Sequence, residues 1–315
     1  MDNIKGILIT MLVPMENHIA NGGEKLLGNA SSIKRRPDER VYISGQMQRH
    51  ALFSAMERLN EGDLLKAETF ISNGDGVTNM IEKDLRADMG GFLHTTKNDY
   101  SGRRTAPLTV TPAVALDPSE VGRDLLVRLK NPRIGEKAVG DLEEKKQALA
   151  TREFSQSDMM HMNFFLDITT LSISKAFEYE KEFHVKTVYF KHTTEEERKR
   201  RVRLFIEATR SINDYANQAR NAVSGEPQQV LIVIDPKLSR KGSRYFVAND
   251  IEKANILNEL TERNATFFVG NDIEGDTSVD AAYSKALKTL ETSSLFDPCG
   301  GDDVIKTFAQ AFEGA

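Results

Sequence analysis

The sequence predicts an α+β fold in which strands and helices alternate at both ends of the chain around an irregular middle. Short aliphatic runs predict the strands, and segments with apolar residues three and four positions apart predict the helices. Residues 128–160 are polar, charged and poor in aliphatic side chains. We therefore expect this region to protrude as an insertion rather than to form core.

The beginning of the chain contains a predicted strand, a long polar loop and a helix. Residues 4–13 are rich in β-branched and aliphatic side chains, and Pro14 is expected to end the strand. The polar loop that follows, 16–40, carries glycines and basic residues, and structureless loops of this length are usually functional or disordered. A helix is expected to open at Gly45. Its predicted apolar face consists of Met47, Ala51, Leu52, Ala55, Met56 and Leu59.

The later part of the chain again alternates between strands and helices, after a mixed pattern over residues 64–127. Thr194 and Glu197 form a capping box that predicts the start of a helix. Two βαβ-like units, one at each end of the chain, fit a ferredoxin-like palm, the fold of RNA-recognition motifs. The predicted strands cover residues 162–177, 230–234 and 265–269, and the predicted helices cover 194–219, 251–262 and 278–290.

The composition is that of an ordinary globular protein, with 39% hydrophobic and 28% charged residues. No run approaches the roughly 20 apolar residues that a membrane helix needs, and the apolar run at 7–13 lacks the flanks of a secretory signal. The single cysteine, Cys299, excludes an internal disulfide and a multi-cysteine zinc site. We therefore expect a cytoplasmic protein without cofactor, metal ion or membrane partner.

The distribution of charge matters more than its sum, because a phosphate feels charges only within about 8–10 Å. The net charge is −5, yet basic residues are clustered and the acids gather elsewhere. One basic groove and one acidic back would explain this pattern, and so would a merely well-solvated surface. The basic clusters lie at residues 34–36, 103–104, 198–203 and 237–244.

Four segments carry a resemblance to a known family. They are VYISGQMQRHAL at 41–52, ADMGGFL at 87–93 with RRTAPL at 103–108, REFS at 152–155, and QAR at 218–220 with Gly225 and Pro227. In order and spacing they resemble CRISPR backbone subunits of the RAMP superfamily, in particular the DevR-like branch. The resemblance extends over residues 1–235.

This resemblance implies a ferredoxin-like (RRM-type) palm, at 1–61 and 161–315, with a fingers insertion at 62–127 and a thumb insertion at 128–160. It also implies a backbone subunit of a type I CRISPR surveillance complex (Cascade). Copies of such a subunit associate head-to-tail along the spacer of a guide RNA (crRNA), beside other effector subunits. Each thumb displaces one nucleotide, which leaves the remaining bases open for pairing with target DNA.

A subunit that holds guides of any sequence must bind phosphates rather than bases. Arginine pairs bidentately with phosphate, and a helix N-terminus attracts anions. Aromatic and thioether side chains, here Phe154 with Met159 and Met160, can form a wedge against which bases stack. The candidate RNA-binding residues are Asn21, Gly22, Lys34, Arg35, Arg36, Gln46, Arg49, His50, Arg103, Arg104, Arg152, Phe154 and Arg220.

A structural role remains open for most of these residues. Residues 34–36 fit a solvated loop, Arg49 an ordinary surface charge, and His50 a packing or capping role. Phe154 fits a local core. The cluster at 198–203 follows three glutamates, so that pairing along one helix explains it.

The sequence gives little support to an enzymatic function. Residues 300–303 (GGDD) copy a metal-binding turn of nucleotide cyclases, but only twelve residues follow, which leaves no room for the second strand of that site. Relatives in type III complexes cleave target RNA with an aspartate after the first strand, whereas residues 18–36 contain no aspartate. We therefore expect no catalytic residue. A type III-like target-RNA endoribonuclease and a DevR-like regulatory protein without guide RNA remain as alternatives.

Overall fold

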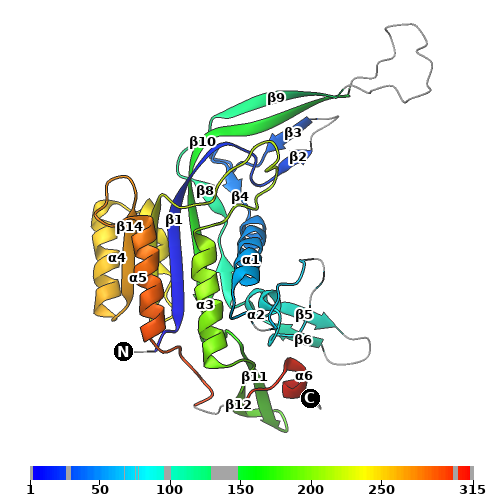
Figure 1. Ribbon diagram of the computed structural model, residues 1–315, viewed down its shortest axis with the longest axis vertical. Coiled ribbons are helices and arrows are strands. Elements are labelled where there is room, and N and C mark those ends of the chain that lie inside the picture. Colours follow the sequence, from blue (N-terminus) through cyan, green and yellow to red (C-terminus); the bar gives the residue numbers. More distant parts are fainter. Residues whose placement is uncertain are drawn as a thin grey trace, which may run out of the picture.

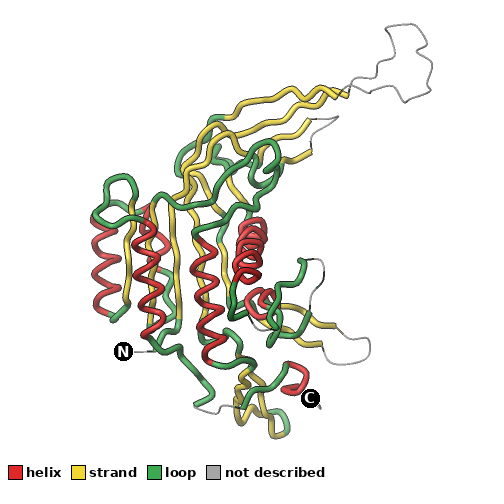
Figure 2. The backbone as a smooth tube through the Cα atoms, in the orientation of Figure 1, coloured by secondary structure: helices red, strands yellow, loops and turns green. Residues whose placement is uncertain are grey.

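The computed structural model describes residues 3–25, 30–66, 68–74, 76, 78–95, 101–128, 148–300 and 304–312. Within these ranges, ten strands form one main sheet and two strand pairs stand apart from it. Helices cover both faces of the main sheet (Figure 1), and long strands extend from the body at one end (Figure 2). The protein is therefore a mixed helix and strand structure built on a largely antiparallel sheet.

The strand β1 lies at the centre of the sheet, paired antiparallel with β10 on one side and with β13 on the other. β14 pairs with the outer edge of β13, while β7 and β8 pair with the outer edge of β10. The order across the centre is thus β14, β13, β1, β10 and then β7 with β8. These strands are β1 (Gly6–His18), β7 (Leu108–Val110), β8 (Ala113–Ala115), β10 (Ala148–Asp167), β13 (Gln229–Asp235) and β14 (Thr266–Asn271).

Helices pack on the sheet because its central strands are apolar on both faces. Successive side chains of a strand point to opposite faces. Ile7 and Ile9 accordingly join the core beneath the helices α1 and α3, while Leu8 packs with Ile256 of α4 on the other face. The helices are α1 (Gly45–Gly62), α3 (Glu195–Thr209) and α5 (Val279–Thr292) on one face, and the 3-10 helix η1 (Lys241–Val247) with α4 (Asp250–Glu262) on the other.

Short elements form a second layer near the lower ends of α1 and α3 in Figure 1. The helix α6 joins two strand pairs there, because the ring of Phe308 meets Phe92 at 5.2 Å and Phe312 meets Phe190 at 5.9 Å. The elements of this layer are α2 (Leu85–Gly90), β5 (Phe92–Thr95), β6 (Ser101–Arg104), β11 (Ile173–Glu180), β12 (Phe183–Lys191) and α6 (Phe308–Phe312).

At the other end of the molecule, β10 extends beyond the central sheet and pairs with β9 as a long hairpin. A smaller hairpin, β2 with β3, lies beside it, and β3 pairs parallel with β10. The short strand β4 leads into α1 and pairs with β8. These strands are β2 (Gly23–Lys25), β3 (Ala30–Ile33), β4 (Tyr42–Ile43) and β9 (Val121–Arg128).

Two predicted strands have different limits in the structure. β1 continues past Pro14 to His18, because beyond Leu12 it pairs with β10 alone and the proline needs no donor toward β13. The predicted strand at 162–177 is two strands, since β10 ends at Asp167 and the chain turns through Ser172, which has a positive φ of 57°. The loop predicted at 16–40 also contains the hairpin β2–β3.

The helix predicted at 194–219 is wrong in its second half, because α3 ends at Thr209. Its start is confirmed, since the Thr194 side chain accepts a hydrogen bond from the backbone N–H of Glu197 at 3.3 Å. Ile212 and Tyr215 continue the apolar stripe, but they reach the core from an irregular segment. The Tyr215 hydroxyl donates to Gln48 Oε1 at 2.7 Å, which fastens this segment to α1.

The predicted insertions do not coincide with element boundaries. β7 and β8, within the range predicted for the fingers, belong to the main sheet. The boundary predicted at residue 160 falls inside β10, and residues 129–147 of the predicted thumb lie outside the described residues. None of the helices in the described part of the chain has the length and apolar character that crossing a bilayer requires.

Candidate nucleic-acid interface

The N-terminus of α1 meets the end of β1 at a junction made by two side chains. Ser44 caps the helix, since its hydroxyl accepts from Met47 N at 3.2 Å. Asn21 Oδ1 accepts from Ser44 N at 3.0 Å, which fixes the orientation of the amide. Asn21 Nδ2 is buried and has no hydrogen-bond partner within the described residues. The exposed Gln46 lies in the first turn of α1, where backbone N–H groups lack intrahelical partners.

A segment after α3, residues 211–225, completes this junction. Asn217, with a positive φ of 64°, donates from Nδ2 to Ile19 O at 3.1 Å and accepts from Arg152 Nη1 at 3.1 Å. Ala216 N also bonds to Ala20 O at 3.1 Å. The half-buried Arg152 of β10 and the exposed Arg220 of the segment therefore belong to one neighbourhood with Asn21 and Gly22. We call this neighbourhood, residues 17–22, 44–46, 152 and 216–221, the junction.

Gly22 is required at the junction for backbone reasons. Its φ of +66° lies in the left-handed region, which most side chains avoid. Its N–H bonds to Ile19 O at 3.0 Å and closes a tight turn at the end of β1. The structure thus brings together four of the predicted residues besides Gln46: Asn21, Gly22, Arg152 and Arg220.

The basic cluster at 34–36 lies on a tight turn after β3. Arg36 N bonds to Arg40 O at 2.9 Å, which closes the turn. Arg35 pairs with Glu39 at 2.6 Å, so part of the positive charge is already compensated. Arg36 is exposed and Lys34 is half-buried. The turn offers an exposed guanidinium rather than the three-cation fork that the sequence predicts.

Arg49 has a structural role that the sequence did not predict. Its Nη2 donates to Gly90 O at 2.6 Å, and its guanidinium lies 5.7 Å from the centre of the Phe53 ring. A Cβ at position 90 would lie 2.5 Å from that Nη2, so a side chain there would displace the guanidinium from this contact. Arg49 therefore joins α1 to α2 rather than facing the 34–36 turn, while His50 beside it is exposed.

Arg104 is a correction to the predicted interface, because it is buried in an ionic network around Asp88. Its Nη2 pairs with Asp88 Oδ1 at 2.5 Å, and it also donates to the carbonyls of Thr170 and Ile173. Arg201 of α3 pairs with Asp88 Oδ2 at 2.6 Å. Burial would raise the pKa of Asp88, but the two arginines hold that pKa below its ordinary value. The side chain of Arg103 lies outside the described residues.

Other basic clusters are also engaged within the chain. Arg198, Arg200 and Arg201 are buried and pair with glutamates of α3, which confirms the structural alternative for residues 198–203. In the cluster at 237–244, Lys241 pairs with Glu259 and Arg244 pairs with Glu252.

The predicted wedge residues differ in their surroundings. Met160 is fully buried in the main core, so it cannot reach a nucleic acid. Phe154 is half-buried on the β9–β10 hairpin, opposite Gly122 of β9. A Cβ at position 122 would lie 2.4 Å from the Phe154 ring, so the ring lies over this glycine. Phe154 therefore has both a local packing role and a partly open surface.

A buried pair of ionisable side chains at the end of β1 escaped sequence reasoning. His18 Nε2 lies 2.7 Å from Asp158 Oδ2, and Ser119 donates to the other carboxylate oxygen. Burial opposes ionisation of Asp158, but the hydrogen bonds from His18 and Ser119 lower its pKa. The strand β1 is thereby fixed against β10 just before the junction.

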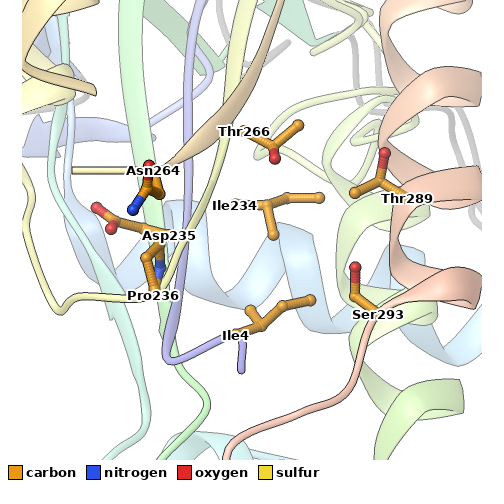
Figure 3. Close-up of a pocket in the computed structure, with 8 residues that line it drawn as sticks. All are labelled: Ile4, Ile234, Asp235, Pro236, Asn264, Thr266, Thr289 and Ser293. Carbon is orange, nitrogen blue, oxygen red and sulfur yellow. The ribbon is translucent and has the colours of Figure 1, made fainter. Parts of the chain in front are cut away.

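A separate pocket of about 300 Å³ lies between β13, β14 and α5 (Figure 3). Its acidic residue Asp235 lies 2.6 Å from Arg263, so its charge is compensated from within the chain. The remaining lining residues are aliphatic, hydroxyl, amide or proline side chains. Within the described residues, no three histidine, cysteine, aspartate or glutamate side chains are grouped for a metal ion. The pocket lining thus offers no strong nucleophile. The junction is the better candidate for a functional site.

Solved structures with a similar fold include the following two. One is described as "CRISPR RNA-guided surveillance complex"; it is 13% identical, with a TM-score of 0.55, and the match covers 90% of this chain and 99% of that chain. The other, "CRISPR RNA-guided surveillance complex, pre-nicking", is 11% identical with a TM-score of 0.52 and the same coverage. A search of curated proteins finds no match.

The fold therefore places the protein in the structural class of these surveillance-complex chains. The family model "CRISPR-associated negative auto-regulator DevR/Csa2" matches residues 9–224. The chain belongs to the DevR/Csa2 family of CRISPR-associated proteins, which confirms the resemblance seen in the sequence.

Proposed function

We propose that this protein is the guide-RNA-binding backbone subunit of a type I CRISPR surveillance complex. Several copies associate head-to-tail along the crRNA spacer and present its bases for pairing with target DNA. Head-to-tail contacts of this kind do not close on themselves, so they generate a helical filament. Other effector subunits would then limit the length of the filament, in a cytoplasmic complex.

The strand order supports a ferredoxin-like palm. Counting β1, β7 with β8, β10 and β13 as strands one to four, their order across the sheet is four, one, three, two. α1 and α3 follow the first and third of these strands and pack on the same face. This order agrees with the βαββαβ arrangement of RNA-recognition motifs and thereby supports the proposal.

The observation that carries the proposal is the convergence of donors and positive charge at the junction. The N-terminus of α1 attracts anions through its dipole and its free N–H groups. Asn21 Nδ2 adds a buried donor without a partner within the described residues. Arg152 and Arg220 add guanidinium groups from β10 and from the segment after α3. Such a set binds a sugar-phosphate chain without reading its bases.

The β9–β10 hairpin has the features expected of a thumb. It projects from the sheet beside the junction, and Arg152 of β10 lies opposite Asp124 of β9 in the strand register. Phe154 is two residues further along β10, with its ring partly open to solvent. An aromatic ring at the side of a phosphate-binding site can support or separate stacked bases.

Charge reversal at the junction and the basic turn tests the proposal. We expect Arg36→Glu with Arg220→Glu to abolish RNA co-purification while leaving the fold intact, because both side chains are exposed. In titrations with single-stranded RNA, the loss of two phosphate contacts lowers the salt slope by about 1.4. The readouts are extracted RNA on a denaturing gel and circular dichroism of the protein.

Lys285→Glu with Lys288→Glu is the matched control, since it makes the same charge change on α5, away from the junction. This control should retain RNA. Equal RNA content in the two double variants would contradict the proposal. RNA-free wild-type monomers would favour the regulatory alternative.

We also propose that the subunit has no catalytic residue. No aspartate follows β1 before the 34–36 turn, where a type III-like backbone nuclease would need one. We expect the assembled complex, incubated with complementary RNA and Mg²⁺, to leave that RNA intact over hours. Periodic cleavage products on a sequencing gel would instead establish the endoribonuclease alternative.

A further inference from the structure

The hairpin β11–β12 carries aromatic side chains on one of its two faces. Strand alternation places Lys175, Phe177 and Tyr179 on the same face of β11. Tyr189 lies directly opposite Lys175, and His184 lies opposite Tyr179. We call this set the aromatic face. Figure 1 shows the hairpin at the end of the molecule opposite to β9–β10.

These rings are open to solvent rather than packed into core. Phe177 is 49% exposed, Tyr179 is 60% exposed and Tyr189 is 40% exposed. The His184 ring stands edge-to-face against Phe177 at 5.5 Å and against Tyr179 at 5.9 Å. The His184 ring therefore packs against two of these rings, while part of the surface of all three remains uncovered.

The charge of the aromatic face favours an anionic partner. The Lys175 ammonium lies 5.5 Å from the centre of the Phe177 ring and is exposed. The carboxylates of β11, Glu178 and Glu180, lie on the opposite face by strand alternation. Exposed rings beside a cation, with the acids of β11 turned away, match the surfaces on which single-stranded nucleic acids stack.

A recess of about 190 Å³ opens at the base of this face. Lys175, Phe177 and Tyr189 line its outer part, and Thr105, Thr169 and Thr170 line it with hydroxyl groups. Hydroxyl groups beside an apolar wall suit the edge of a base or a sugar. The recess thus continues the aromatic face toward the body of the protein.

We infer that the aromatic face binds single-stranded nucleic acid, with bases stacked on Phe177, Tyr179 and Tyr189 and a phosphate held by Lys175. The site is distinct from the junction, because it lies at the opposite end of the molecule and shares no residue with it. Stacking is tolerant of sequence, since every base has a π face. The protein therefore contacts an unpaired strand at two separate places.

A single introduced tryptophan reports on this site alone, because the chain contains no tryptophan of its own. Tyr179→Trp replaces an exposed aromatic residue with another, so we expect the fold to stay intact. We expect oligo(dT) and oligo(rU) of about ten nucleotides, within the usual site size, to quench the emission of this tryptophan saturably and less at high salt. Quenching by only one of them also supports the inference and identifies the preferred sugar.

Two controls separate stacking from other events. Ile251→Trp places the reporter on α4 instead, at a side chain that is 77% exposed, and its emission should not change. Heparin supplies polyanionic charge without bases, so it should not quench the Tyr179→Trp protein. Unchanged emission of that protein at saturating oligonucleotide would overturn the inference, whether or not labelled oligonucleotide binds elsewhere on the protein, and so would equal quenching by heparin. If the aromatic face binds a protein instead, the emission of the Tyr179→Trp protein should not change when oligonucleotide is added.

Neighbouring substitutions measure the contribution of the rings. In the Tyr179→Trp protein, Phe177→Ala should raise the oligonucleotide concentration at half-quenching by about 5- to 150-fold, which corresponds to the loss of one stacked base. Ile251→Ala in the same protein removes an exposed apolar side chain far from the aromatic face and should leave that concentration unchanged. An equal effect of the two substitutions would contradict stacking at the aromatic face.

Discussion

Replacing Asp88 with alanine should lower the free energy of unfolding by about 3–5 kcal/mol, because two buried guanidinium groups would lose their counter-ion. Asp88 is fully buried and pairs with Arg104 and Arg201, and it also accepts hydrogen bonds from Ser172 N at 2.8 Å and Ser172 Oγ at 2.7 Å. The network joins α2, β6, α3 and the turn before β11. Urea unfolding followed by circular dichroism measures the change.

Asp280→Ala is the control for this prediction. Asp280 also pairs with an arginine, Arg210, at 2.6 Å, but its side chain is exposed. Exposed ion pairs contribute little, so this variant should lose less than about 1 kcal/mol. Similar losses in the two variants would show that the Asp88 network does not stabilise the fold.

Replacing Gly91 with alanine should cost at least about 2 kcal/mol of unfolding free energy, since two independent penalties apply. Gly91 has a φ of +66°, and a Cβ there would lie 2.5 Å from Arg104 O and 2.8 Å from Ala106 N. Both contacts are with backbone, which cannot move aside without disturbing β6. Thermal and urea unfolding of the variant measure the cost.

Gly62→Ala offers the matched comparison, at the last residue of α1. A Cβ there meets nothing within 4 Å, and helical alanine is favoured over glycine by roughly 0.5–1 kcal/mol. This variant should be as stable as the parent or slightly more so. A Gly91→Ala protein that is equally stable would mean that the turn tolerates a side chain.

Several residues of the family motifs ADMGGFL and RRTAPL have structural roles in this protein. In ADMGGFL, Asp88 is the centre of the ionic network, Gly90 makes room for Arg49, and Gly91 supplies the turn. In RRTAPL, Arg104 is a partner of Asp88. The motif residues were thus recognised correctly, but Arg104 and Arg49 were assigned to RNA because side-chain contacts across the fold cannot be read from spacing.

Elements with strong periodicity were predicted well. The apolar face of α1 is confirmed, with Ala51, Leu52, Ala55 and Met56 buried, and the positions of β13, α4 and α5 are close to those predicted. The limits of β1 and α3 were not predictable from local pattern. Pro14 fits within β1 because the pairing with β13 stops at Leu12. The apolar residues after Thr209 belong to an irregular segment that packs on α1.

The candidate site was also predicted only in part, because the sequence indicates residues but not their contacts with distant segments. Asn21, Gly22, Gln46, Arg152 and Arg220 were named separately, from four segments, and the structure brings them to one junction. Asn217, which links Ile19 to Arg152, was missed because its role depends on a positive φ and on contacts with distant residues. The pairing of His18 with Asp158 was missed because 140 positions separate them.

The most direct test of the account is to map where the guide RNA touches the protein. Photo-crosslinking of the assembled complex with 4-thiouridine in the guide, followed by mass spectrometry of the peptides, provides this map. We predict crosslinks to residues 17–22, 44–50 or 216–221, around the N-terminus of α1. Crosslinks that spare all three segments, and fall instead on α4 and α5, would contradict a guide-RNA site at the junction.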